Sequence, residues 1–284
     1  MEIKWNILYR GYLDSCNYDC VYCPFAKKKN TKEELLEDKI ALQKFTNWVA
    51  ERKEKLSILL TPWGEGLIRK YYQEAMVRLS HLESVEKIAI QTNLACNIKW
   101  IEKANKDKFA LWITYHPKEV SYEKFLAKCR KLIAMDIDFS IGVVGVKEHF
   151  EAIEKLKNDI TERYIWVNAY KREQDYYTTA EKKWLTEKDK LFPINNTVHQ
   201  TEGKACKAGY SSFSINGDGD VFRCHFIKKK IANIYEEDLN DIKKAENCTN
   251  TECRCYIGYI NFDSLELDKI YKENLMARIP ESFS

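Results

Sequence analysis

Six short runs of β-branched, aliphatic and aromatic residues recur through the first two thirds of the chain, with helix-like stretches between them. In order they are IKWNILY, LSILLT, EKIAIQT, ALWITY, DFSIGVVG and RYIWVNAY. Short apolar runs of this kind predict buried strands. Strands that alternate with helices form parallel sheets, because the helices make the crossover connections. The sequence therefore predicts an α/β domain, built as an open sheet or a partial barrel.

The first intervening stretch, residues 31–55, has the pattern of an amphipathic helix. Leu35, Leu42, Phe45 and Val49 recur on one face, with charged residues elsewhere. Further helices are expected over residues 67–82, 119–134 and 147–156.

The pattern changes after about residue 190. Residues 171–205 are polar and contain few strand signals, which indicates a helix and a linker. The next stretch, SSFSINGDGDVFRCHF, predicts two strands joined by a tight turn, since glycine supplies the positive φ that such turns require. We expect two domains, residues 1–195 and residues 196–284.

Composition narrows the class of protein. Of 284 residues, 45% are hydrophobic, which argues against disorder, and no apolar run approaches the ~20 residues that a membrane span needs. The opening residues lack the order of a signal peptide, so we expect a cytoplasmic protein with no membrane association. The net charge of +3 is small against 46 basic and 43 acidic residues, so a nucleic-acid partner is not indicated.

The ten cysteines are concentrated at two places, three in residues 16–23 and five in residues 206–255. In a reducing compartment such groups favour metal binding or redox chemistry over disulfides. Cys16, Cys20 and Cys23 supply one ligand fewer than a structural zinc site needs. Three thiolates can hold three irons of a [4Fe-4S] cluster and leave the fourth iron open for a substrate or cofactor.

The spacing Cys16-x3-Cys20-x2-Cys23, in a loop directly after the first predicted strand, resembles the signature of the radical S-adenosylmethionine (radical SAM) superfamily. The resemblance implies a partial (β/α)6 TIM-like barrel and a [4Fe-4S] cluster that binds S-adenosylmethionine. It also implies that Tyr22, the aromatic residue before the third cysteine, lies near the adenine.

Two later motifs resemble the same family. TPWGEG resembles its Gly-Gly-Glu motif, with Gly64 and Glu65 kept and Trp63 in place of the first glycine. The kept pair would bind the methionine amino group. QTNL resembles the frequent Thr-Asn-Gly, which implies a cofactor contact for Asn93, although Leu94 replaces the glycine.

The last three predicted barrel strands carry weaker matches. Thr114 stands where the family often has a hydroxyl near the ribose. IGVVGVKEH resembles a Gly-x-Ile-x-Gly-x-x-Glu pattern that ends at Glu148, and Asn168 ends the sixth strand. Each has a plainer interpretation: Glu65 and Glu148 as solvated loop acids, Thr114 as a strand former and Asn168 as a strand-end cap.

Histidine 116 follows the fourth predicted strand. It is a candidate acid-base group or substrate contact, with a structural histidine as the alternative. Substrate contacts are also expected from its neighbour Tyr115, and from Tyr170 and Lys171 after the sixth strand.

The second group of cysteines begins with Cys206-x12-Gly219-x4-Cys224, which resembles the start of SPASM and twitch domains. Such domains carry auxiliary iron-sulfur clusters. The five candidate ligands are Cys206, Cys224, Cys248, Cys253 and Cys255. Five suit one auxiliary cluster, expected to be [4Fe-4S], with four ligands and one cysteine left over, which favours the shorter, twitch-like form over a full SPASM domain. The sequence does not choose among the last three, and a zinc ribbon is the structural alternative.

The resemblance implies an enzyme that reductively cleaves S-adenosylmethionine to a 5'-deoxyadenosyl radical. The radical would abstract a hydrogen atom from a peptide or small metabolite. With an auxiliary cluster as electron acceptor, the product would be a cross-link, a thioether or a dehydrogenated residue. A flavodoxin- or ferredoxin-type protein is the expected electron donor.

Two alternatives remain open at this point. One is a redox-neutral epimerase in which Cys96, Cys129 or a tail thiol returns a hydrogen atom. The other is a protein without enzymatic activity, either a zinc-stabilised module or a two-cluster electron carrier.

Overall fold

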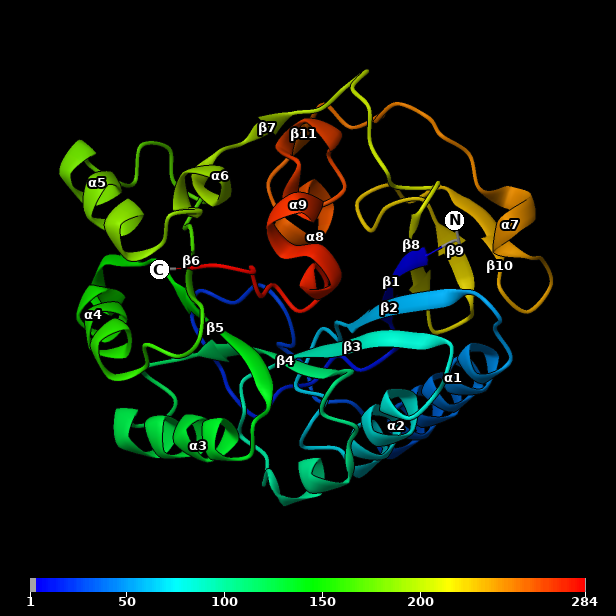
Figure 1. Cartoon of the computed structure of the whole chain (residues 1–284), viewed down its shortest axis with the longest axis horizontal. Helices are drawn as coiled ribbons and strands as arrows, with labels where there is room; N and C mark the ends of the chain where they lie inside the picture. Colours follow the sequence, from blue (N-terminus) through cyan, green and yellow to red (C-terminus); the bar gives the residue numbers. More distant parts are fainter. Residues whose placement is uncertain (1–3, 284) are drawn as a thin grey trace.

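The computed structural model describes residues 4–283, and its centre is a parallel sheet (Figure 1). The six predicted strands are all present and pair in chain order. They are β1 (Lys4–Arg10), β2 (Lys55–Leu60), β3 (Val85–Thr92), β4 (Phe109–Tyr115), β5 (Asp138–Val144) and β6 (Ile165–Asn168). The predicted α/β architecture is confirmed, while Ile3, which the first predicted run includes, lies outside the described residues.

The helices cover the outer face of this sheet, which curves around the C-terminal segment in Figure 1. They are α1 (Lys32–Ala50), α2 (Lys70–Ser80), α3 (Tyr122–Ala134) and α4 (Phe150–Asp159). Helix α1 begins at a capping box, in which Thr31 and Glu34 each bond the other's backbone N–H. Its residues Leu42, Phe45 and Val49 are buried, as the apolar pattern predicts.

Three of the helices begin about three residues later than expected. Before α4, for example, residues Lys147–His149 form the short 3-10 helix η2. Another short 3-10 helix, η1 (Lys99–Lys103), connects β3 to β4. After β6 the chain forms α5 (Thr179–Lys188), α6 (Phe192–Asn196) and the two-residue strand β7 (His199–Gln200).

The tail extends the same sheet. Strands β8 (Ser212–Asn216), β9 (Asp220–Phe222) and β10 (Lys230–Asn233) give the order β10-β9-β8-β1-β2-β3-β4-β5-β6. Strand β8 runs parallel to β1 and antiparallel to β9, which confirms the predicted hairpin. The expected boundary at residues 195 and 196 falls at the end of α6, and the division into two domains stays a prediction.

After β10, helix α7 (Leu239–Ile242) packs at the edge of the sheet, where Leu239 joins the core between sheet and helices. Strand β11 (Glu252–Cys253) pairs with β7, and the concave side of the sheet is filled by the segment that follows it. This segment comprises α8 (Tyr256–Tyr259), η3 (Asp263–Leu265), α9 (Leu267–Tyr271) and η4 (Lys272–Asn274). Tyr256 of α8 packs edge-on against Trp112 of β4 at 5.1 Å, within an apolar cluster that also includes Leu8 and Trp166. The C-terminal segment therefore forms the inner layer of the partial barrel (Figure 1).

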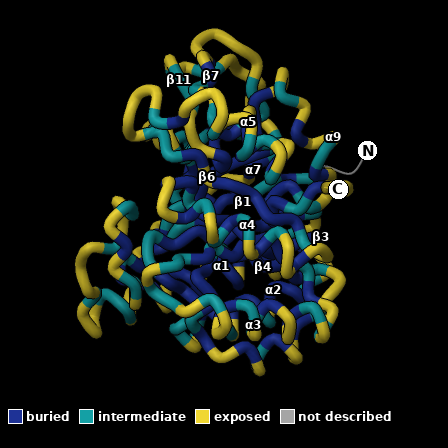
Figure 2. Tube along the Cα trace, turned by 90° about the vertical axis from the view of Figure 1, so that its left-hand side faces the viewer, coloured by how far each residue is buried: buried dark blue, intermediate teal, exposed yellow. Residues whose placement is uncertain are grey.

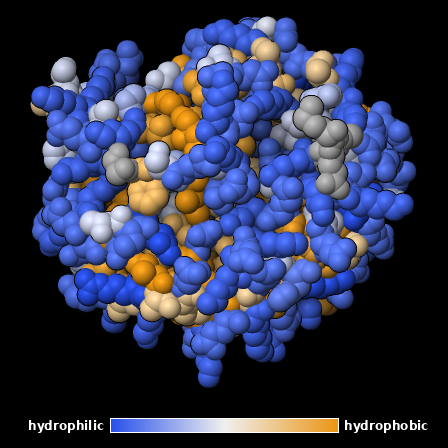
Figure 3. Space-filling model, in the orientation of Figure 1, coloured by the Kyte–Doolittle hydropathy of each residue, from blue (hydrophilic) through white to orange (hydrophobic). Residues whose placement is uncertain are grey.

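Burial follows this layering. The strands form the buried centre of the trace and the connecting loops are largely exposed (Figure 2). The face in Figure 3 is mostly hydrophilic, with small apolar patches. None of the helices within residues 4–283 is long and apolar enough to cross a membrane.

Candidate functional site

The first three cysteines lie in the loop that follows β1. The backbone N–H of Cys23 donates to the carbonyl of Cys20 at 3.0 Å, which closes a tight turn. Burial raises the pKa of Cys20 to about 12, and it also raises the pKa of Cys16. Buried thiols without a cationic partner hold their protons, so a bound metal would supply the charge that makes them thiolates.

The loop after β2 packs directly against the cysteine loop. A Cβ on Gly64 would lie 1.8 Å from the Ser15 carbonyl oxygen, and the N–H of Glu65 donates to that oxygen at 3.1 Å. Glycine is therefore required at position 64 because a side chain would separate the two loops.

Glu65 is buried, so its interpretation as a solvated loop acid is wrong. Its carboxylate accepts hydrogen bonds from the Thr92 hydroxyl at 2.8 Å, the Asn93 N–H at 2.6 Å and the Leu67 N–H at 2.9 Å. Burial raises the pKa of this carboxyl, against these hydrogen bonds. Glu65 thus joins the loops after β2 and β3, and its expected contact with a methionine amino group stays a prediction.

Asn93 reaches the cysteine loop from the end of β3. Its side-chain N–H group donates to Asn17 at 3.0 Å and points to the Cys16 sulfur at 3.7 Å. The next residue, Leu94, has a φ of 58°, in the left-handed region that favours glycine. The sequence departs from Thr-Asn-Gly at this position, but the backbone takes the conformation that the glycine would favour.

His116, directly after β4, lies beside the cysteine loop. Its Nδ1 is 2.8 Å from the Tyr22 hydroxyl and 3.3 Å from the Cys20 sulfur, and its ring stacks with that of Tyr22. Burial, and to a smaller extent the nearby His149, lowers the pKa of His116 to about 4, so the imidazole is neutral at pH 7. The structure brings both predicted residues to a cysteine of the first group.

The remaining predicted cofactor contacts lie at the same end of the sheet. Thr114 is half-buried near the end of β4, Glu148 is exposed in η2, and Asn168 is exposed at the end of β6. Their expected roles stay predictions. Tyr115 is buried against Phe125 of α3, at 4.5 Å between ring centres, so it faces the helices and is not a substrate contact from the inner side.

Two functional candidates were missed in the sequence, Arg10 and His225. Arg10 ends β1, and its guanidinium donates to the carbonyl and hydroxyl oxygens of Thr61 at 2.6 and 3.0 Å and pairs with the His225 ring. Burial lowers the pKa of Arg10 to about 10. A charged residue at the carboxyl end of a predicted strand was the available signal.

His149 was also missed. It is buried at the end of η2, where its Nδ1 donates to the Val144 carbonyl at 2.9 Å. Its ring meets that of Tyr22 edge-on at 5.3 Å. The buried His149 and the half-buried His116 thus flank Tyr22.

Of the five cysteines in the C-terminal part of the chain, four line one cavity and one lies outside it. Cys206, Cys224, Cys248 and Cys253 line one small cavity, together with the apolar side chains of Ile227 and Phe262. A Cβ on Gly258 would lie 2.6 Å from the Cys253 sulfur, so this glycine lets the thiol turn inward.

Cys255 lies outside that cavity and is exposed. Among the charges that act on Arg10 and Lys171, Cys255 has the largest effect on the pKa of each cation, and it opposes the effect of burial. Arg10 ends β1 and Lys171 follows β6, so Cys255 lies between the carboxyl ends of the two outermost barrel strands.

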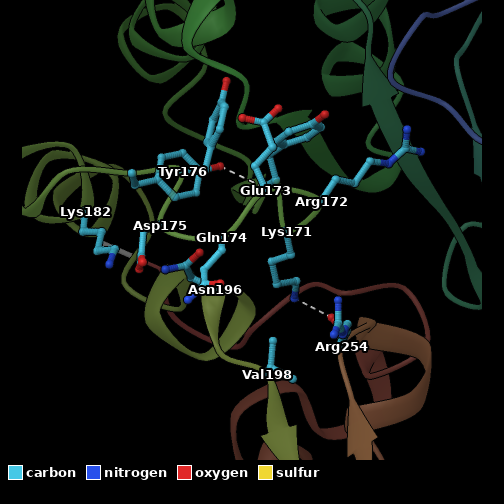
Figure 4. A pocket seen from close by; sticks show the side chains of 12 residues that line it. Lys171, Arg172, Glu173, Gln174, Asp175, Tyr176, Lys182, Asn196, Val198 and Arg254 are labelled. Atoms are coloured by element: carbon cyan, nitrogen blue, oxygen red, sulfur yellow. Dashed lines mark hydrogen bonds between the residues drawn. The ribbon is translucent and has the colours of Figure 1, made fainter.

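A pocket of about 480 Å³ opens beside Lys171 (Figure 4). The loop after β6 forms one wall, and Asn196, Val198 and Arg254 form the other. The Lys171 ammonium donates to the carbonyls of Asn195 and Arg254, and burial lowers its pKa to about 8. Tyr170 also lines the pocket, so both predicted contacts after β6 share one cavity.

The donor set fits iron-sulfur clusters. Within residues 4–283 no three His, Cys, Asp or Glu side chains converge on a single metal-ion position. A [4Fe-4S] cluster places each thiolate on a different iron, so its ligands need not converge in this way. Three soft thiol ligands in one loop and four around one cavity match that requirement.

Comparisons with known proteins agree with this arrangement. Residues 206–273 match the SPASM family, described as an iron-sulfur cluster-binding domain. The chain is also similar to the structure of native anSMEcpe with bound AdoMet and Cp18Cys peptide, with a TM-score of 0.55, 15% identity and coverage of 97% of this chain and 88% of that chain. The structure of native anSMEcpe with bound AdoMet gives a TM-score of 0.56 and 15% identity, with coverage of 96% of this chain and 88% of that chain. A comparison with curated proteins found no match.

At this identity the structural similarity establishes the fold. The expected partial barrel with a SPASM-type iron-sulfur tail is thereby confirmed.

Proposed function

We propose that the chain is a radical SAM oxidoreductase that modifies a peptide. The observation that carries the proposal is the division of seven thiols into a group of three at the barrel mouth and a group of four in the SPASM tail. Three ligands suit a cluster with one open iron, and four suit a closed auxiliary cluster.

In this proposal Cys16, Cys20 and Cys23 hold the open cluster, and the loops joined through Glu65 shape the site around it. When bound, the cluster and S-adenosylmethionine supply a 5'-deoxyadenosyl radical that takes a hydrogen atom from an unactivated carbon. The four tail thiols hold the auxiliary cluster that accepts the second electron. The apolar inner layer of α8 and α9 keeps water from entering the site through the barrel.

A peptide substrate has two supports. The similar anSMEcpe structure contains a Cp18Cys peptide. In the present chain the pocket beside Lys171 is open and polar enough for a backbone, and Arg254, which lines it, directly precedes the exposed Cys255. A flavodoxin- or ferredoxin-type donor is part of the same proposal, as is oxidative modification as a cross-link, thioether or dehydrogenation.

The test measures iron, sulfide and 5'-deoxyadenosine on anaerobically reconstituted protein with dithionite and S-adenosylmethionine. We expect about eight irons per chain, as two [4Fe-4S] clusters require. A Cys16→Ala, Cys20→Ala, Cys23→Ala variant should keep about four irons and lose cleavage. Stoichiometric zinc without cleavage in the wild type would refute the proposal and leave a metal-stabilised binding module.

The exposed position of Cys255 favours a second candidate, a redox-neutral epimerase in which this thiol returns a hydrogen atom. The other thiols considered from the sequence are less suitable, because Cys96 and Cys129 are buried in the core between sheet and helices. Deuterium from solvent in the peptide product would favour the epimerase. A product two hydrogens lighter would favour the oxidoreductase.

A further inference from the structure

Three polar atoms lie close together at the carboxyl ends of the barrel strands. Two belong to the cysteine loop after β1, and the third belongs to the residue directly after β4. The Nδ1 of His116 lies 3.3 Å from the Cys20 sulfur and 2.8 Å from the Tyr22 hydroxyl oxygen. The Tyr22 hydroxyl is also close enough to the Cys20 thiol to lower the pKa of that thiol. The three groups therefore lie close together, with His116 in contact with both of the others.

The position of this triangle is fixed by packing. The rings of Tyr22 and His116 are within 7° of parallel, with centres 5.9 Å apart. Tyr18 meets His116 edge-on at 5.8 Å, and His149 meets Tyr22 edge-on at 5.3 Å. Neither ring can turn away from Cys20 without displacing an aromatic neighbour.

Ligation of iron changes what Cys20 can do in this triangle. A thiol can donate a hydrogen bond, whereas a metal-bound thiolate can only accept one. A protonated Nδ1 of His116 lies within hydrogen-bond distance of the sulfur, and the hydroxyl of Tyr22 is the second donor beside it. A half-buried donor without an acceptor destabilises the folded state, so both donors are expected to turn to the thiolate.

We propose that His116 and Tyr22 are positioning residues that hydrogen-bond the Cys20 thiolate and raise the reduction potential of the open cluster. Reduction adds one electron and therefore negative charge that spreads onto the cysteine sulfurs. Donors to those sulfurs stabilise the reduced state more than the oxidised state. The inference rests on the proposed function, because it requires that Cys20 ligate the cluster.

The experiment is a redox titration of the reconstituted full chain, followed by electron paramagnetic resonance. His116→Leu removes the donor, whereas His116→Asn places a side-chain amide N–H where Nδ1 was. Tyr22→Phe removes only the hydroxyl. His81→Leu is the matched control, since His81 is exposed and bonds the Lys103 carbonyl on another side of the molecule. The triple cysteine variant supplies the auxiliary-cluster signal to be subtracted.

We expect His116→Leu and Tyr22→Phe to shift the open-cluster potential to more negative values, His116→Asn to restore most of the shift, and His81→Leu to leave it unchanged. An unchanged potential in Tyr22→Phe, or equal shifts in His116→Leu and His116→Asn, would overturn the proposal. If the His116→Leu variant does not load iron, the open-cluster potentials of Tyr22→Phe and His116→Asn test the proposal. A triple variant that keeps all its iron would instead overturn the proposed function, which separates the two failures.

Discussion

The guanidinium of Arg10 lies over the ring of Trp63, with 3.7 Å between its central carbon and the ring centre. Trp63 in turn packs against Phe25 of the cysteine loop at 4.4 Å and against His225 at 5.5 Å. His225 directly follows Cys224. This stack therefore connects the loop of the first three cysteines with the cavity of the other four.

Replacing Arg10 tests the stability of this connection. Arg10→Met removes the hydrogen bonds to Thr61 and the cation–π contact, so we expect a loss of about 2–4 kcal/mol in the free energy of unfolding. Urea unfolding of the variant and the wild type measures this loss. The matched control is Arg52→Met, where the guanidinium lies 5.1 Å from the Trp48 ring and the expected loss is below about 1 kcal/mol. Equal losses would contradict a special role for Arg10.

Asp38 predicts a pH dependence of stability. This carboxylate of α1 is fully buried and accepts hydrogen bonds from the N–H groups of Tyr12 and Leu13 and the hydroxyl of Tyr71. Burial nevertheless raises its pKa. The folded state therefore binds the proton more tightly than the unfolded state, and stability falls as the pH rises from about 4 through the higher folded pKa.

In Asp38→Asn this contribution to the pH dependence should disappear. Urea unfolding of both proteins at a series of pH values checks the sign. A wild-type stability that rose relative to the variant across that range would show that the hydrogen bonds outweigh burial.

Gly64→Ala should separate the loops after β1 and β2. The new Cβ would clash with the Ser15 carbonyl, so we expect a loss of at least about 2 kcal/mol and weaker iron loading by the first three cysteines. Gly203→Ala is the control, because a Cβ there meets open space and only the positive φ of 72° adds strain, worth about 1 kcal/mol. Thermal unfolding and iron analysis test both variants. Similar losses would refute the loop contact.

Cys253→Ser and Cys255→Ser should differ sharply although the residues are two apart. Cys253 faces the four-thiol cavity, so its replacement should remove up to about four irons. Cys255 is exposed outside it, so Cys255→Ser should keep the full iron content. Iron and sulfide analysis of the two proteins checks this assignment, and the reverse pattern would exchange the roles of the two thiols.

Much of the barrel could be predicted because its strands are continuous apolar runs, and the place of His116 follows from its position after the fourth run. In a continuous apolar run, however, the sequence does not show which face of the sheet each side chain occupies. Tyr115 was therefore assigned to the site, whereas it packs against α3. The choice between Cys253 and Cys255 depends on where α8 begins, since Cys255 is its N-cap and the chain turns there. Arg10, His149 and His225 act through contacts between distant segments, and only Arg10 has a local signal in the sequence, its charge at the end of a predicted strand.

The inner layer formed by α8 and α9 also has a consequence for biosynthesis. Trp112 and Trp166 of the barrel are covered by Tyr256 and Arg278, which the ribosome adds more than ninety residues later. Until those residues emerge, the concave side of the sheet has no lining. The nascent barrel therefore depends on the tail for closure.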